Sequence, residues 1–207
     1  MSFTLVTKMP PSKNATFVLT ALITATLWIQ QASANSYSLT ELVRQTMQAY
    51  FEKGNGSQFS VSALLKGKSL NEYNKRGGVF VTLSTDGKPR ACWGSVYPTH
   101  ANLAESTVFA TIGALNKDYR YKPIRASEWK FLKPQVTVIN RIEPIDNLAG
   151  QNPLRDGLML RSGAKTAVLL PGETSDAYYQ LVRCKLKAGL TKGESYQLYR
   201  LKAEIYE

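Results

Sequence analysis

One stretch, residues 77–96, constrains the fold more than any other part of the chain. It reads Gly-Gly-Val-Phe-Val-Thr-Leu-Ser-Thr-Asp-Gly-Lys-Pro-Arg-Ala-Cys-Trp-Gly-Ser-Val. The β-branched and apolar residues of its first half predict a largely buried strand. Asp86 and Gly87 tolerate positive φ, and a second apolar run follows them, so the stretch predicts a β-hairpin. A glycine within a strand, such as Gly94, often marks a bulge or the close approach of another backbone.

Three helices and four more strands are predicted elsewhere. Capping patterns and helical spacing of apolar residues predict helices over 38–54, 102–115 and 174–188. Strands are predicted over 134–142, where Pro144 would end the strand, in a second hairpin over 158–170, and over 199–205, which reads as half-exposed. Hairpins and single strands, rather than βαβ units, predict an α+β single domain with a mainly antiparallel sheet flanked by about three helices.

The first 34 residues are typical of a secretory signal peptide. An apolar stretch of 15 residues, Ala15 to Ile29, follows two lysines, and Ala32-Ser-Ala34 supplies small residues for cleavage. The alternative is an uncleaved membrane anchor, although a span needs about 20 apolar residues. We therefore expect a signal peptide (or N-terminal anchor) over 1–34 and a domain over 35–207, exported to the periplasm or the extracellular space.

The net charge favours anionic partners without identifying one. The chain has 26 Lys and Arg against 15 Asp and Glu, a formal charge of +11. Lys8 and Lys13 lie in the leader, which leaves 24 basic and 15 acidic residues and a charge of +9 in the domain. The charge is spread along the chain, with no basic run and no basic motif interleaved with aromatic residues. Nucleic-acid binding is therefore not expected, and membrane contact is expected only through an uncleaved N-terminal segment.

Cys92 is the candidate catalytic group, and two interpretations of it stay open. Arg90 is two residues away in a strand, so we expect its side chain on the same face, where a cation would lower the pKa of the thiol. Cys92 would then be a thiolate nucleophile or a redox group. The alternative is a small buried hydrophobic residue, the commonest state of a free cysteine. A base is missing nearby, because His100 is the only histidine and would have to reach Cys92 through a loop.

Cys184 lies on the apolar face of the third predicted helix and is expected in the core. A Cys92–Cys184 disulfide is permitted after export, provided that the two Cα atoms lie within about 7 Å. Whether the two cysteines are paired stays open at this point.

A second candidate site is an anion clamp. Asp118 and Arg120 follow the second helix in a turn. Arg90 and Arg120 would converge on a carboxylate or phosphate, with Asp118 orienting one guanidinium. Aromatic walls would come from Trp93, Tyr119 and Tyr121. The alternative is an ion pair between Asp118 and Arg120 that only fixes the turn.

Metal and cofactor chemistry find little support in the sequence. One histidine, no CxxC pair and no paired acidic motif argue against a zinc site. No glycine-rich loop of the dinucleotide or P-loop type is present. We expect no metal and no cofactor.

The motifs together resemble the AMMECR family (AMME-syndrome chromosomal-region candidate proteins). The family signature is a strand followed by Leu-Arg-Gly-Cys-Ile-Gly, which is similar to Gly78-Val-Phe-Val-Thr-Leu and Arg90-x-Cys-x-Gly94 in this chain. Four further blocks follow in the family's order: Asp118-Tyr-Arg-Tyr-Lys-Pro123, Gly157-Leu-Met-Leu-Arg-Ser-Gly, Leu169-Leu-Pro171 and Cys184-x-Leu-Lys-Ala-Gly-Leu190. The resemblance covers roughly Leu39 to Glu207. The departures are Ala91 for glycine, Trp93 for isoleucine and Tyr119 for proline.

The resemblance implies no established reaction, so two functions stay open. The first is a small-ligand-binding or scaffold module with a cleft around the Arg-x-Cys-x-Gly hairpin, whose partner is a small anionic ligand or another protein. The second is an enzyme that uses Cys92 as a thiolate. The module is preferred because the sequence shows no base to activate the thiol. A monomer is expected. The resemblance also implies similar cysteines in cytosolic relatives, which argues against the disulfide.

Overall fold

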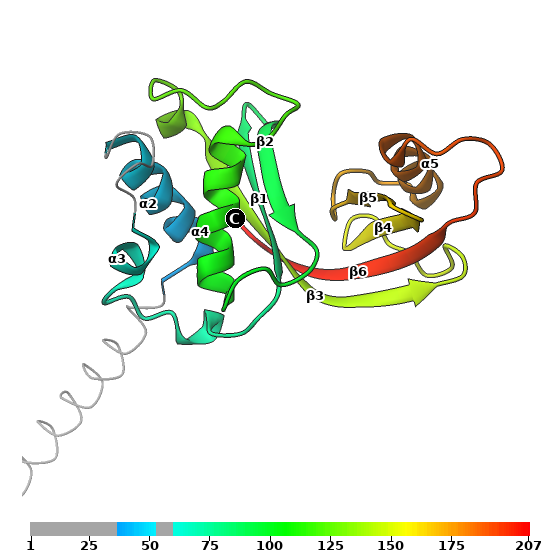
Figure 1. Cartoon of the computed structure of the whole chain (residues 1–207), viewed down its shortest axis with the longest axis horizontal. Coiled ribbons are helices and arrows are strands. Elements are labelled where there is room, and N and C mark those ends of the chain that lie inside the picture. The colour runs from blue at the N-terminus through cyan, green and yellow to red at the C-terminus, as the bar shows by residue number, and fades with distance from the viewer. Residues whose placement is uncertain (1–36, 53–59) are drawn as a thin grey trace, which may run out of the picture. The chain divides into compact units, whose positions relative to one another are not determined.

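Helices and strands follow one another much as the sequence predicts (Figure 1). The computed structural model describes residues 37–52 and 60–207, and the predicted leader lies outside them. Residues Tyr37–Glu207 form one compact unit. In chain order its elements are α2 (Leu39–Glu52), α3 (Val61–Leu65), a 3₁₀ turn (Asn71–Tyr73), β1 (Gly78–Thr85), β2 (Lys88–Ser95), α4 (Leu103–Asn116), a 3₁₀ turn (Trp129–Phe131), β3 (Lys133–Ile145), β4 (Asp156–Ser162), β5 (Lys165–Leu169), α5 (Ala177–Ala188) and β6 (Gln197–Tyr206).

The β1–β2 hairpin contains one irregularity. Asp86 and Gly87 join the strands with φ values of 49° and 72°, as a type I′ turn requires. Leu83 pairs with Ala91 whereas Ser84 pairs with Pro89, so Arg90 has no partner on β1. Arg90 is therefore the extra residue of a β-bulge. The strict alternation that predicted Arg90 on the same face as Cys92 does not hold across a bulge.

The α+β fold with an antiparallel sheet is confirmed. Six strands pair in the order β2-β1-β3-β6-β4-β5, and all pairs are antiparallel. The three longer helices, α2, α4 and α5, are the three that the sequence predicts. β6, predicted as half-exposed, lies at the centre of the sheet between β3 and β4, and its Leu201 is fully buried.

The predicted end of β3 at Pro144 is wrong, because β3 continues to Ile145. Pairing with β1 ends at Ile139, while pairing with β6 continues through Pro144 and Tyr199. Past Ile139 no described strand pairs with that edge of β3. A proline, which has no N–H, is tolerated in a strand where that side lacks a partner.

Two hydrophobic clusters lie under helices on the same face of the sheet. The first joins α2 and α4 to β1, β2 and β3, and includes Leu42, Val81 and Val136. The second joins α5 to β4 and β5, and includes Leu158 and Cys184. Because consecutive strand residues point to opposite faces, the other face of the sheet is covered by neither group of helices.

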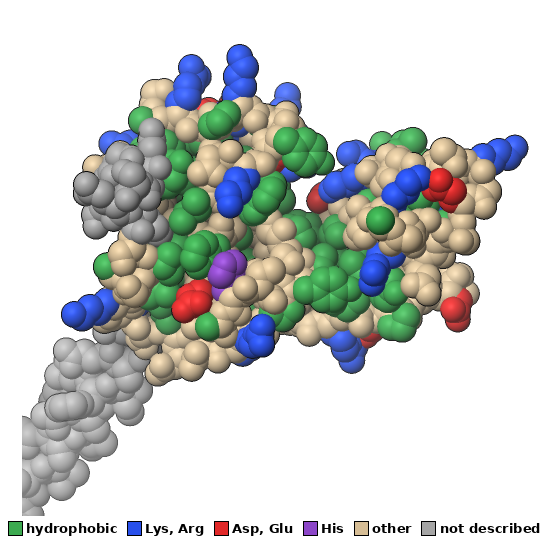
Figure 2. All heavy atoms as spheres, viewed as in Figure 1, with side chains coloured by type: hydrophobic (Ala, Val, Ile, Leu, Met, Phe, Trp, Pro, Cys, Tyr) green, Lys and Arg blue, Asp and Glu red, His purple; other side chains and the backbone are tan. Residues whose placement is uncertain are grey.

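That other face, called the inner face below, is curled. In a flat sheet, β2 and β5 would be about 24 Å apart, five spacings of about 4.8 Å. In Figure 1, however, β3 and β6 run along the bottom of the sheet, and β1–β2 and β4–β5 rise from them on the same side. The curl therefore brings the two edge strands toward each other. Figure 2 shows a hollow between the part of the domain that holds β1 and β2 and the part that holds β4, β5 and α5.

No helix in the part of the chain that the structure describes is long and apolar enough to cross a membrane.

Candidate functional site

The outer edge of β2 is closed at Cys92 by the turn that follows α4. The backbone N–H of Cys92 donates to Asp118 Oδ2 at 2.8 Å, and Arg120 Nη2 donates to the carbonyl oxygen of Cys92 at 3.4 Å. Asp118 and Arg120 thus supply an acceptor and a donor where a neighbouring strand would do so. The predicted proximity of these two residues to Cys92 is what the structure shows, although they contact its backbone and not its thiol.

Asp118 and Arg120 hold each other in a fixed geometry. Arg120 donates to Asp118 through Nε at 2.9 Å, Nη2 at 2.7 Å and its backbone N–H at 3.2 Å. The Asp118 side chain is 4% exposed and that of Arg120 is 42% exposed. Burial alone would raise the pKa of Asp118, but the hydrogen bonds from Arg120 and from Cys92 hold it below its usual range. The hydrogen bonds to Asp118 raise the pKa of Arg120.

Arg90 pairs with Glu128, a residue that sequence reasoning missed. Its Nε and Nη2 donate to the two carboxylate oxygens at 3.2 and 3.0 Å, a bidentate pair. Burial would raise the pKa of Glu128, but hydrogen bonds from the Arg125 backbone and from Arg90 lower it. The guanidinium carbons of Arg90 and Arg120 lie 6.0 and 5.5 Å from the centre of the Tyr121 ring. Tyr121 therefore contacts both cations.

The thiol of Cys92 lies on the inner face, where Thr82 Oγ1 donates to its sulfur at 3.3 Å. Burial raises the pKa of the thiol, an effect that the Thr82 hydrogen bond and the positive charges of Arg120 and Lys187 oppose only in part. Cys184 is fully buried, and burial raises its pKa to about 12. Both cysteines are free, so the structure contains no Cys92–Cys184 disulfide.

Apolar side chains cover the inner face around Cys92. Five of them are buried and six are partly buried, and together they reach from the hairpin to the end of β5. The buried ones are Val96, Ile139, Met159, Leu170 and Leu201, and the partly buried ones are Phe80, Cys92, Ile142, Val168, Tyr199 and Ala203. We call this surface, with the hollow above it, the inner cleft. At its β2 end Arg120 donates to the carbonyl oxygen of Cys92. At its β5 end Glu173 accepts from the N–H of Leu170, and Lys187 donates to the carbonyl oxygen of Val168.

Trp93 and His100 lie on the opposite side of β2 from the Cys92 thiol. Trp93 contacts Gly113 of α4, and the ring of His100 stacks on Phe109 of α4 at 4.1 Å. The two line a cavity of about 340 Å³ between α4 and the edge of β2. The structure therefore does not bring Trp93 together with Cys92, Arg90 and Arg120, and no Cys92–His100 pair forms. Tyr119 is 88% exposed and walls no site.

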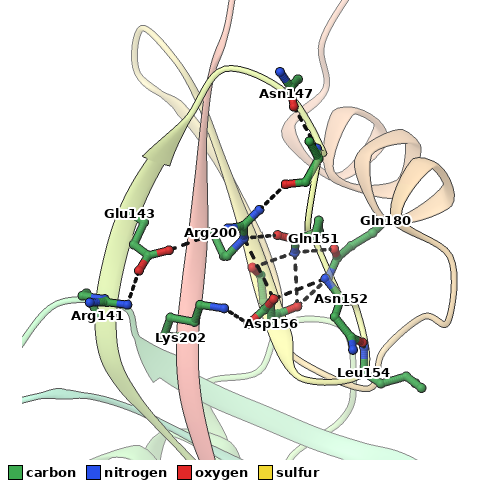
Figure 3. A network of polar contacts seen from close by, with 12 residues as sticks. Arg141, Glu143, Asn147, Gln151, Asn152, Leu154, Asp156, Gln180, Arg200 and Lys202 are labelled. Carbon is green, nitrogen blue, oxygen red and sulfur yellow. Dashed lines mark hydrogen bonds and ion pairs between the residues drawn. The ribbon is translucent and has the colours of Figure 1, made fainter.

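A second polar network lies on the helix-covered face, away from the predicted site (Figure 3). The buried carboxylate of Asp156 accepts from Lys202 at 2.8 Å and lies 3.9 Å from Nε of Arg200. Buried Gln180 donates to the backbone of Asp156 and accepts from Gln151. The network ties the loop before β4 to β6 and α5. The residues of this network are scattered along the chain, so no sequence motif predicts it. Because they are paired with one another, we assign the network a structural role.

The described residues also contain no group of three or more His, Cys, Asp or Glu side chains that could hold a metal ion.

The fold defines a class of protein: an α+β domain with a curled antiparallel sheet and a cysteine-bearing edge strand. A family model, AMMECR1, matches residues 40–207, so the chain belongs to the AMMECR1 family. A curated protein of Thermotoga maritima is 32% identical over 139 residues, which cover 65% of this chain and 80% of that protein. One from Methanopyrus kandleri is 30% identical over 189 residues, 82% of this chain and 86% of that protein. The crystal structure of an uncharacterized protein from Pyrococcus horikoshii superposes with a TM-score of 0.71 at 26% identity, covering 81% of this chain and 88% of that chain.

Proposed function

We propose that this AMMECR1-family domain is a binding module that takes a small, largely apolar ligand in the inner cleft. The observation that carries the proposal is the apolar inner face, whose six partly buried side chains are covered by none of the described helices. Clefts of this kind, with an apolar lining and a few fixed polar groups, are the usual small-molecule sites.

The polar groups around Cys92 favour a ligand with little net charge. Asp118 neutralises Arg120, and Glu128 neutralises Arg90, so neither arginine offers a free positive charge. Nη1 of Arg90 has no hydrogen-bond partner among the described residues, but it is buried and a ligand cannot reach it. We therefore replace the small anionic ligand expected from the sequence by a mainly apolar one.

The test is native mass spectrometry of the full chain purified without denaturant. We expect a bound small molecule on the unsubstituted protein and its loss in Val168→Trp, which fills the cleft. Lys192→Trp places the same indole on an exposed loop and should keep the ligand. Equal occupancy in both variants would place the ligand elsewhere and overturn the proposal.

The alternative, an enzyme with Cys92 as a thiolate, has one contact in its favour. The hydroxyl hydrogen bond from Thr82 stabilises a negative sulfur. Burial nevertheless raises the pKa of this thiol, and a protonated thiol is a poor nucleophile. The structure also places His100 on the other side of β2.

Alkylation separates the two functions. In a Cys184→Ala variant, we expect native Cys92 to react with iodoacetamide at pH 7.5 at least about tenfold more slowly than the same chain in 6 M guanidinium. The rate should rise with pH through a pKa above the usual value of about 8.5. Rapid native alkylation at neutral pH would favour the enzyme.

We also propose that the leader directs export and is removed after Ala34. The support is the sequence pattern of lysines, apolar stretch and small residues. The measurement is the intact mass of the protein from the producing cell, fractionated into envelope and membrane. A chain beginning near Asn35 outside the membrane is expected, and a full-length chain held in the membrane fraction would contradict it.

A further inference from the structure

One position on the outer edge of β2 is open for backbone pairing. Cys92 turns its N–H and its carbonyl outward, to Asp118 and Arg120. In an antiparallel ladder, alternate residues point the same way, so Gly94 also turns both groups outward. Gly94 is exposed, and outside the β1–β2 ladder no hydrogen bond to its backbone occurs among the residues that the structure describes.

The cavity between α4 and β2, called the α4–β2 groove below, lies directly beside this open position. It is lined by Gly94 and Trp93 from β2 and by Phe109 and Ala110 from α4, and has a volume of about 340 Å³. Phe109 is 41% exposed, a large apolar side chain left at the surface beside an unpaired strand edge. An unpaired edge next to an apolar groove is the arrangement that accepts an added strand.

The dimensions of the α4–β2 groove fit a short extended chain. Its lining residues on α4 and at the C-cap of this helix run from Ser106 to Lys117, about 17 Å at 1.5 Å per residue. An extended peptide rises about 3.3 Å per residue, so about five residues span the groove. The Asp118–Arg120 cap limits the added strand on one side, because it already occupies the backbone of Cys92.

We propose that an extended segment of a partner protein binds in the α4–β2 groove and pairs with the backbone of Gly94 as a seventh strand. Alternate side chains of the segment face Trp93 and Phe109, and these are apolar or aromatic. A carboxylate of the segment lies near Lys117, an exposed cation that has no acidic partner among the described residues. A peptide fits better than a small molecule because Gly94 presents both a backbone N–H donor and a backbone carbonyl acceptor, the pair of groups that a neighbouring strand would bind.

The probe is a displayed library of random hexapeptides, selected on the full chain, with the enriched peptides synthesised for binding measurements by fluorescence anisotropy. N-methylation of the one peptide amide that pairs with Gly94 removes a backbone donor and leaves the side chains in place. We expect one position whose methylation weakens binding about tenfold, with its neighbours much less sensitive. An enriched peptide insensitive to methylation at every position would overturn strand addition, as would the absence of any enriched peptide.

Protein variants locate the site. Phe109→Ala should weaken peptide binding about tenfold, whereas Tyr178→Ala, which removes an exposed aromatic on α5, should not. Lys117→Gln should weaken it about threefold at low salt and little at high salt, and Lys192→Gln is its control. Equal effects of a variant and its control would overturn the proposal. Self-association abolished by Phe109→Ala, seen by sedimentation, would assign the groove to a second copy instead.

The α4–β2 groove and the inner cleft lie on opposite sides of β2, so the tests of the two proposals are independent of each other. Phe109→Ala should leave the small-molecule signal in native mass spectrometry unchanged, and Val168→Trp should leave peptide binding unchanged.

Discussion

Gly113→Ala is expected to lower the free energy of unfolding by about 2–3 kcal/mol. A glycine replaced by alanine inside a helix ordinarily gains about 1 kcal/mol, so the expected sign is reversed. The reason is the indole of Trp93, because a Cβ built on Gly113 would lie 2.0 Å from its Cδ1 and 2.5 Å from two more ring atoms. A rigid ring cannot make room for the added methyl group unless β2 or α4 moves.

Urea unfolding followed by tryptophan fluorescence measures this effect. The double variant Gly113→Ala with Trp93→Leu should recover more than half of the loss, since the smaller side chain leaves room for the methyl group. A single variant as stable as the unsubstituted protein would show that Trp93 turns away from α4 at little cost. That result would also change the lining of the α4–β2 groove.

Asp118→Ala is expected to destabilise the domain by about 3 kcal/mol. The substitution leaves the N–H of Cys92 and the backbone N–H of Arg120 without their acceptor. It also removes the partner of the Arg120 guanidinium, which contributes less because that group is 42% exposed and regains water. The melting temperature should fall, and the edge of β2 at Cys92 should open to backbone amide exchange.

The Asp118 contribution depends on pH in a defined direction. The folded-state pKa of Asp118 lies below its ordinary value, so its stabilisation is fully present above about pH 4, the unfolded pKa. It is lost as pH falls below that value through the folded pKa. Asp118→Asn should therefore flatten the decline in stability below pH 4, whereas Asp86→Asn in the exposed β1–β2 turn should leave it steep. An equally steep decline in both variants would contradict the assigned role.

The hairpin shows how far local sequence carries the fold. The Asp86-Gly87 turn fixes a two-residue loop, and its register alone would pair Thr82 with Ala91. The bulge at Arg90 shifts that pairing by one residue, so that Thr82 faces Cys92 and reaches its sulfur. No local residue signals the bulge, and its extra residue, Arg90, pairs with Glu128, which lies 38 positions further along the chain.

The candidate site was predictable only in part, for a related reason. Asp118 and Arg120 were expected near Cys92. That they bind its backbone at the edge of β2 could not be predicted, because it depends on where the chain leaves the C-terminus of α4. Trp93 was expected beside Cys92, although adjacent strand residues point to opposite faces, and this simple rule would have separated them. The position of β4 and β5 relative to Cys92 depends on the curl of the whole sheet, which periodicity does not describe.

The central place of β6 has a consequence for how the domain folds. β6 is the last described strand in the sequence, yet it lies between β3 and β4 and joins the two halves of the sheet. Its pairing with β3 brings together Val136 and Tyr206, about 70 residues apart along the chain. A chain that lacks residues 197–206 can form the β1–β2 hairpin and the β4–β5 hairpin, but it cannot unite them in one sheet. Commitment to the native sheet therefore waits for β6, and such pairing between distant parts of the chain makes folding slow.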